Sequence, residues 1–147
     1  MNDIDCNRDE PKTNRDDNLA QILNGGPSGQ KPDWAATINN LMTLAKEANK
    51  SFEFDRTINY LSTLEEIWNS KGLPEFSLEL RIELHLEKGK AYSSQGMLDE
   101  AIGEYQKTLA FCRGPGQLKI RSETFAQIGQ LLAKQGDHDR ALGYLQR

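Results

Sequence analysis

The stretch GMLDEAIGEYQKTL, residues 96–109, places a glycine, a small residue and an aromatic residue at fixed distances. Gly96 stands five residues before Ala101, and Ala101 stands four residues before Tyr105. The same distances recur in GDHDRALGYL, residues 136–145, with a leucine in place of the tyrosine. Glycine readily ends helices in the left-handed conformation, and a small residue lets two helices approach closely. The pattern therefore predicts a helix that ends at the glycine and a second helix that packs against it.

Three blocks of the chain share this spacing in register. The second block begins at His85 and the third at Phe125, 40 residues later, while the more degenerate first block begins at Leu41, 44 residues before His85. Their small positions are, in order, Ala45 and Thr57, Gly89 and Ala101, and Gly129 and Ala141. We therefore expect helix pairs in which these small positions allow close contact and neighbouring large side chains fill the remaining space.

Local signals place the ends of the expected helices. Asp33 and Asp137 are expected to cap helix N-termini, and Gly72 with Pro74 is expected to stop a helix. Apolar residues recur with helical periodicity, and no stretch alternates with period two. We predict an all-α chain with helices over residues 34–50, 55–69, about 75–95, 98–112, 117–135 and 138–147.

These spaced positions resemble the tetratricopeptide repeat, whose signature combines large, small and aromatic residues in this order. The resemblance covers about residues 34–147, with repeats near 34–72, 75–113 and 116–147. The 40-residue spacing is similar to the longer repeats of kinesin light chains and of the adaptors that link G-protein subunits to the spindle-orientation machinery. The resemblance implies an α-solenoid, a superhelix of about three antiparallel helix hairpins.

The resemblance also implies where a partner binds, because in this family the first helix of each hairpin lines a concave groove. Helical geometry then assigns the groove to Lys46, Lys50, Glu83, Glu87, Lys90, Gln127, Gln130 and Lys134. The lysines of this set are expected to form a ladder for an acidic segment, the alternative being ordinary solvated lysines. A groove for the carboxylate of a chaperone tail is disfavoured, because among the matching positions only Lys46 is basic.

Two departures from the repeat carry further expectations. Lys88 stands where the repeat has an apolar residue, so either its helix is rotated or its ammonium group extends to water. The third block stops at Arg147, inside its second helix, and nothing follows to cover Leu142 and Leu145. Because terminal repeats normally carry a polar cap, we expect a fragment of a longer array, or a last helix covered by a partner or a second copy.

Residues 1–32 are polar, charged and rich in glycine and proline, which predicts a disordered N-terminal arm before a helical domain over residues 33–147. Within the arm, Leu19, Ile22 and Leu23 form a short apolar stripe. This stripe is a candidate to dock into the groove or onto another copy, against the simpler interpretation as a linker.

Composition excludes several classes of function. The formal net charge of −4 argues against nucleic acid as a partner, since such binding needs a basic surface. No stretch of 18 apolar residues and no secretory signal is present, so we expect an intracellular, cytoplasmic protein without membrane contact. The two cysteines, Cys6 and Cys112, are expected to be unpaired thiols.

The sequence offers no catalytic site and no cofactor or metal site. His85 and His138 occupy positions that correspond to apolar ones, with no Cys, Asp or Glu cluster at ligand spacing beside either. The glycines of GGPSG, residues 25–29, are not followed by the Lys-Ser/Thr start of a phosphate-binding helix. We therefore do not expect an enzyme.

The expected function is a non-catalytic protein-interaction module of a signalling adaptor or scaffold, which binds an extended or helical segment of another protein in the groove. The lysine ladder, where it forms, favours an acidic segment. The alternative is a self-assembly element that forms a homo-oligomer through the uncovered last helix or the arm. An accessory subunit that positions an enzyme in a complex would have the same sequence features.

Overall fold

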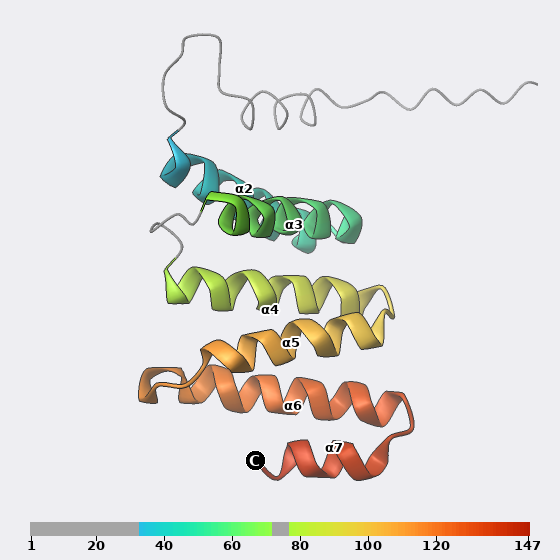
Figure 1. Cartoon of the computed structure of the whole chain (residues 1–147). Helices are drawn as coiled ribbons and strands as arrows, with labels where there is room; N and C mark the ends of the chain where they lie inside the picture. Colours follow the sequence, from blue (N-terminus) through green and yellow to red (C-terminus); the bar gives the residue numbers. More distant parts are fainter. Residues whose placement is uncertain (1–32, 72–76) are drawn as a thin grey trace, which may run out of the picture. The chain divides into compact units, whose positions relative to one another are not determined.

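The structure is a computed structural model that describes residues 33–71 and 77–147. Within these ranges the chain is all-α, and its six α-helices pack as three consecutive hairpins (Figure 1). The hairpins are α2 (Trp34–Lys50) with α3 (Phe54–Lys71), α4 (Leu78–Ser94) with α5 (Leu98–Phe111), and α6 (Leu118–Lys134) with α7 (His138–Leu145). A short 3-10 helix, η1 (Pro115–Gln117), precedes α6. The predicted fold class is confirmed at this level.

Residues 38–147 form one compact unit, and the described residues before them, 33–37, belong to another. The described part of that other unit is the start of α2, where the Asp33 carboxylate accepts a hydrogen bond from the backbone N–H of Ala36 at 3.1 Å. The predicted cap is therefore present. The expected arm, with Leu19, Ile22, Leu23 and Cys6, lies outside the described residues.

The start of α4 differs from the predicted one. Helix α4 begins at Leu78 and not near residue 75, because Ser77 is its N-cap: the Ser77 hydroxyl accepts from the backbone N–H of Leu80 at 3.2 Å. The expected stop at Gly72 and Pro74 lies outside the described residues. At α7 the Asp137 carboxylate accepts from the N–H of Arg140 at 3.2 Å, as predicted.

All three hairpins turn in the same way. In the second, the N–H of Met97 donates to the carbonyl of Tyr92 and the N–H of Gly96 to that of Ser93, which is the Schellman pattern. The third turn repeats both bonds around Gly136, and the first repeats them around Phe52. The left-handed residue has φ of 78° at Gly96, 85° at Gly136 and 61° at Phe52. Each turn therefore needs one residue with positive φ.

Close packing within the second and third hairpins depends on glycine. A Cβ atom at Gly89 would lie 2.7 Å from the ring of Tyr105, and one at Gly129 would lie 2.8 Å from the side chain of Leu145. Ala101 and Ala141 are buried beside them. The spacing that predicted small and large residues in contact thus corresponds to direct contact between paired helices.

Consecutive hairpins are joined by α3 against α4 and by α5 against α6. The same hydrogen bond occurs at both junctions: the Gln95 side chain donates to the Asp55 carboxylate at 2.7 Å, and the Gln135 side chain donates to that of Asp99 at 2.7 Å. The first helix of each later hairpin is therefore tied at its C-terminal end to the second helix of the hairpin before it.

Candidate functional site

A cavity of about 500 Å³ lies beside the turn of the first hairpin, and we call it the turn pocket. It combines residues of α2, the α2–α3 turn, the start of α3 and the C-terminal half of α4. Its lining consists of Lys46, Asn49, Lys50, Phe52, Phe54, Glu87, Lys90 and Ser94. Three lysines therefore stand against a single glutamate, with two aromatic rings beside them.

Two of these lysines are paired within the chain. The Lys90 ammonium lies 2.6 Å from the Glu87 carboxylate, which also accepts from the Asn49 amide at 2.8 Å. The Lys46 ammonium lies 2.5 Å from the carboxylate of Glu83. Because both lysines are about half exposed, each pair contributes little, roughly 0–1 kcal/mol. A partner's carboxylate can replace such contacts at low cost.

Lys50 and Phe52 are both exposed residues of the turn pocket. Lys50 is exposed and makes no ion pair with any residue in the described ranges. Phe52 is 79% exposed, and its ring meets that of Phe54 edge-on, with 6.1 Å between centroids. An unpaired cation and an uncovered ring thus lie at the same pocket.

The structure brings together only part of the predicted groove set. Lys46, Lys50, Glu87 and Lys90 line the turn pocket, and Glu83 joins them through its ion pair with Lys46. The remaining three, Gln127, Gln130 and Lys134, are exposed on α6 and do not line this pocket.

Sequence reasoning alone does not point to Phe52 and Phe54, because helical periodicity identifies faces of helices and not residues of a turn. The signal available was the register, since Phe52 stands 44 residues before Gly96, the same interval as separates the first two blocks.

The predicted assembly surface is exposed where it is described. Leu142 is 56% and Leu145 is 53% exposed on α7. The residues 40 positions earlier, Ile102 and Tyr105, are buried in the core that α5 forms with α6. The same helix face is thus covered in the second hairpin and open in the third.

A second feature is a cluster of charged side chains between α3, α4 and α5, here called the charge network. It consists of Glu65, His85, Lys88, Glu104 and Lys107. The Lys88 ammonium lies 2.7 Å from the Glu65 carboxylate and 4.0 Å from that of Glu104. The His85 Nδ1 atom lies 2.7 Å from the other Glu104 oxygen. Since an ionised carboxylate only accepts hydrogen bonds, His85 donates here.

The charge network corrects the expectation that Lys88 extends to water, and it gives His85 a single partner that the sequence did not indicate. The side chain of Lys88 does not extend to water: it is 7% exposed, because Glu65 and Glu104 supply its counter-charges inside the protein. His85 does have a carboxylate beside it, contributed by Glu104 from the neighbouring helix, 19 residues away. Spacing along one helix does not indicate such a partner.

Burial and pairing act in opposite directions on the two glutamates. Burial alone would raise the pKa of Glu104, but hydrogen bonds from His85 and Lys107 and the charge of Lys88 outweigh it, so the pKa lies below 4.5. Burial would also raise the pKa of Glu65, but the hydrogen bond and the charge of Lys88 outweigh that effect, so the pKa of Glu65 is lowered as well. Both carboxylates are therefore ionised at neutral pH, and the network pairs opposite charges across the junction of the first two hairpins.

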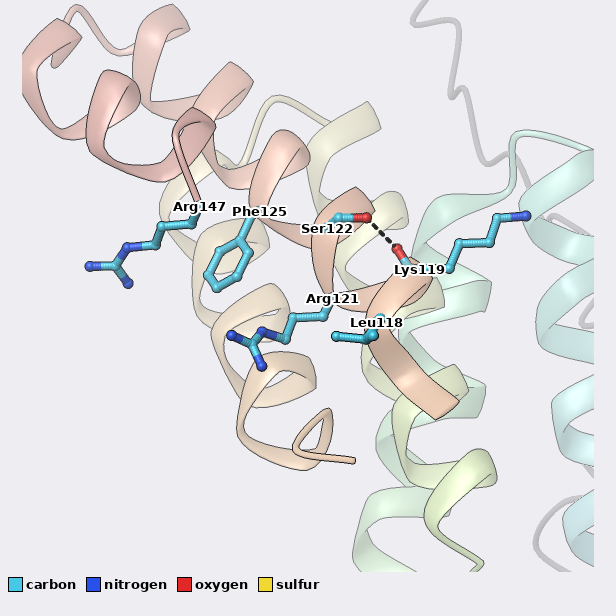
Figure 2. Close-up of a pocket in the computed structure, with 6 residues that line it drawn as sticks. All are labelled: Leu118, Lys119, Arg121, Ser122, Phe125 and Arg147. Atoms are coloured by element: carbon cyan, nitrogen blue, oxygen red, sulfur yellow. Dashed lines mark hydrogen bonds between the residues drawn. The ribbon is translucent and has the colours of Figure 1, made fainter. Parts of the chain in front are cut away.

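A smaller second pocket, of about 390 Å³, lies on α6 beside the last residue of the chain (Figure 2). It is lined by Leu118, Lys119, Arg121, Ser122, Phe125 and Arg147. The guanidinium groups of Arg121 and Arg147 lie 5.7 and 5.9 Å from the centre of the Phe125 ring, and the Ser122 hydroxyl donates to the Lys119 carbonyl. None of these residues belongs to the predicted site.

Among the described residues, no three His, Cys, Asp or Glu side chains are grouped so that they could hold a metal ion. Nor is any helix in the described ranges long and apolar enough to cross a membrane. Cys112 is a free, buried thiol whose pKa is raised by burial.

Comparison with known proteins adds no further assignment: no protein-family model matches the sequence, and no curated protein matches it at a significant level. The class defined by the structure is an all-α chain of consecutive helix hairpins.

Proposed function

We propose that the chain is a non-catalytic protein-interaction module of the tetratricopeptide type, part of a cytoplasmic signalling adaptor or scaffold. Its first helices, α2, α4 and α6, carry the surface that binds an extended or helical segment of a partner. The supporting observation is the turn pocket, where predicted groove lysines and two aromatic rings surround one cavity. A preformed pocket on packed helices lets a partner segment bind without the module having to become ordered.

The acidic character of the partner follows from the charges of the turn pocket. Lys50 has no counter-charge in the described ranges, and Lys46 and Lys90 are held only by exposed pairs. A segment that carries carboxylates can form ion pairs with these three lysines, whereas a basic segment is repelled by them. The excess of lysine over glutamate in the lining therefore favours an acidic segment.

Reversal of two lysines tests this function. We expect the double variant Lys46→Glu, Lys90→Glu to bind its partner about tenfold more weakly or worse, a loss of roughly 1.4 kcal/mol or more. The measurement captures proteins from cell lysate on the immobilised chain, identifies them by mass spectrometry and titrates the retained partner. Circular dichroism is expected to show unchanged helicity, because both lysines are exposed.

The matched control is the variant Lys119→Glu, Arg140→Glu, which changes the net charge equally but lies on α6 and α7. We expect it to keep the partner. If the partner stays on the Lys46, Lys90 variant, the turn pocket is not the binding site. If the control alone loses it, the surface of α6 and α7 is the binding site.

A second candidate function is self-assembly through α7. Leu142 and Leu145 are exposed where Ile102 and Tyr105 are buried. In addition, Asp139 holds the place of Asp55 and Asp99, which accept from glutamines at the two junctions, yet Asp139 has no partner in the described ranges. The outer face of α7 thus carries the apolar residues and the aspartate of a hairpin junction, but no helix of a further hairpin packs against them in the described ranges.

Mass in solution as a function of concentration checks this candidate. If α7 mediates assembly, the average mass by light scattering rises with concentration, and Leu142→Glu keeps the chain monomeric because a charge cannot be buried unpaired in the contact. Leu118→Glu, at a comparably exposed leucine of α6, is expected to leave the association intact. A constant monomer mass for the unaltered chain would rule assembly out.

A further inference from the structure

Phe52 occupies the one position of its turn that the other two hairpins give to glycine. The three turns make the same pair of backbone hydrogen bonds, and the residue with positive φ is Phe52, Gly96 or Gly136. A bulky residue at φ of 61° is a genuine outlier, because its Cβ atom crowds the backbone in the left-handed region. Glycine would make this turn without that strain.

Core packing does not compensate for the strain at Phe52. The side chain is 79% exposed, the largest exposed fraction among the exposed large apolar residues of the described ranges. Its aromatic contact is with Phe54, edge-on, at the rim of the turn pocket. The first turn therefore combines an unfavourable backbone conformation with an uncovered ring, and strain of this kind concentrates at ligand-binding positions.

The surroundings of the ring specify what can cover it. Lys50, two residues earlier, lines the same cavity and has no counter-charge in the described part of the chain. Lys46 and Lys90 line it as well, against Glu87. A ligand that satisfies both features needs an apolar side chain for the rings and a carboxylate for the ammonium groups.

We propose that Phe52, with Phe54, is the apolar anchor of the turn pocket and fixes its specificity for one kind of partner segment. The segment carries a large apolar side chain next to an acidic one. The apolar side chain packs on the Phe52 ring, and the carboxylate pairs with Lys50. This inference rests on the proposed partner-binding function and adds the residue that selects the partner. Aromatic residues that become covered in this way commonly dominate binding.

The test uses a phage-displayed library of random 12-residue peptides selected on the immobilised chain. The affinities of the selected peptides, made synthetically, are then measured for three variants. Phe52→Gly and Phe52→Asn remove the ring and keep the turn, since both residues tolerate positive φ. Leu118→Ala, at a comparably exposed leucine outside the pocket, controls for loss of apolar surface.

The expected peptides pair Leu, Ile, Phe or Trp with a neighbouring Asp or Glu. Phe52→Gly and Phe52→Asn weaken their binding about tenfold or more. Leu118→Ala leaves it unchanged. The Phe52→Gly protein meanwhile melts higher, by about 4 °C, because the turn loses its strain. Loss of affinity together with a gain of stability separates a binding role from a structural one.

The outcomes that contradict the inference differ from those that contradict the function. Selected peptides that are acidic without an apolar residue, or that bind Phe52→Gly as well as the unaltered chain, overturn the role of Phe52 and leave groove binding intact. Apolar peptides without acidic residues overturn the pairing with Lys50. A library that yields no peptide bound at the turn pocket overturns the proposed function and this inference together.

Discussion

Replacing Glu104 by alanine is expected to lower the free energy of unfolding by about 3–5 kcal/mol. The side chain of Glu104 is 8% exposed and contacts His85, Lys88 and Lys107. Its removal leaves the buried His85 without its acceptor and reduces the counter-charge of the buried Lys88 to Glu65 alone. Leaving a buried polar group without its partner destabilises a protein by far more than the complete pair had stabilised it. Urea unfolding followed by far-UV circular dichroism measures the change.

The control for this prediction is Glu100→Ala, an exposed glutamate in the first turn of the same helix. We expect this variant to lose no more than about 1 kcal/mol, the contribution of a carboxylate near a helix N-terminus. Equal losses in the two variants would show that the charge network contributes nothing specific to stability.

At acidic pH, the free energies of unfolding of the unaltered chain and of Glu104→Ala are expected to differ less than at neutral pH. The pKa values of Glu65 and Glu104 are lower in the folded state than the ordinary 4.5. A lowered folded-state pKa means that the stabilisation is fully present above the unfolded-state value and is lost as pH falls through the folded-state value. The effect of the variant is therefore expected to be largest near neutral pH and to decline below pH 4.5.

The two hairpin junctions are filled by different kinds of side chain, charged at the first and apolar at the second. At the first junction α3 and α4 contribute Glu65, His85 and Lys88, all members of the charge network. At the second, the residues in the same register are Leu109, Phe125 and Ile128, of which Ile128 lies in the apolar core and Leu109 packs against it. Ile128 and Leu109 fill the second junction with apolar contacts, whereas each member of the charged set at the first junction requires a polar partner.

Helices and their ends could be predicted from the sequence because their causes are local. Helical periodicity, the caps at Asp33 and Asp137 and the left-handed Gly96 and Gly136 all act within a few residues. The pairing of small with large residues was also readable, since Gly89 and Tyr105 belong to a pattern repeated in the chain.

The charge network and the turn pocket could not be predicted in this way. Lys88 meets Glu65 from 23 residues away and on another helix, so periodicity marks its face as buried without naming the counter-charge. The same holds for Lys46 with Glu83 and for the aromatic rim of the turn pocket, where residues from three helices and a turn converge. Contacts between elements depend on how the helices are placed, which the pattern along one helix does not contain.

Replacing Gly89 by alanine is expected to destabilise the protein by about 1–3 kcal/mol, although alanine is the better helix former. The new Cβ atom would lie 2.7 and 2.9 Å from two carbons of the Tyr105 ring. Tyr105 is 2% exposed, so its ring cannot move aside without disturbing the core between α5 and α6. Thermal and urea unfolding measure the loss.

Gly103, on the next helix, supplies the matched control with the opposite sign. A Cβ atom at Gly103 would meet nothing within 4 Å, so Gly103→Ala is expected to stabilise the protein by about 0.5–1 kcal/mol through helix propensity alone. Gly129→Ala should fall between the two, because its nearest neighbour, Leu145, is half exposed and can shift. If Gly89→Ala and Gly103→Ala changed stability in the same direction, contact with Tyr105 would not be the reason for glycine at position 89. A double-mutant cycle of Gly89→Ala with Tyr105→Leu completes the test, since a direct clash predicts that the leucine relieves much of the cost of the alanine.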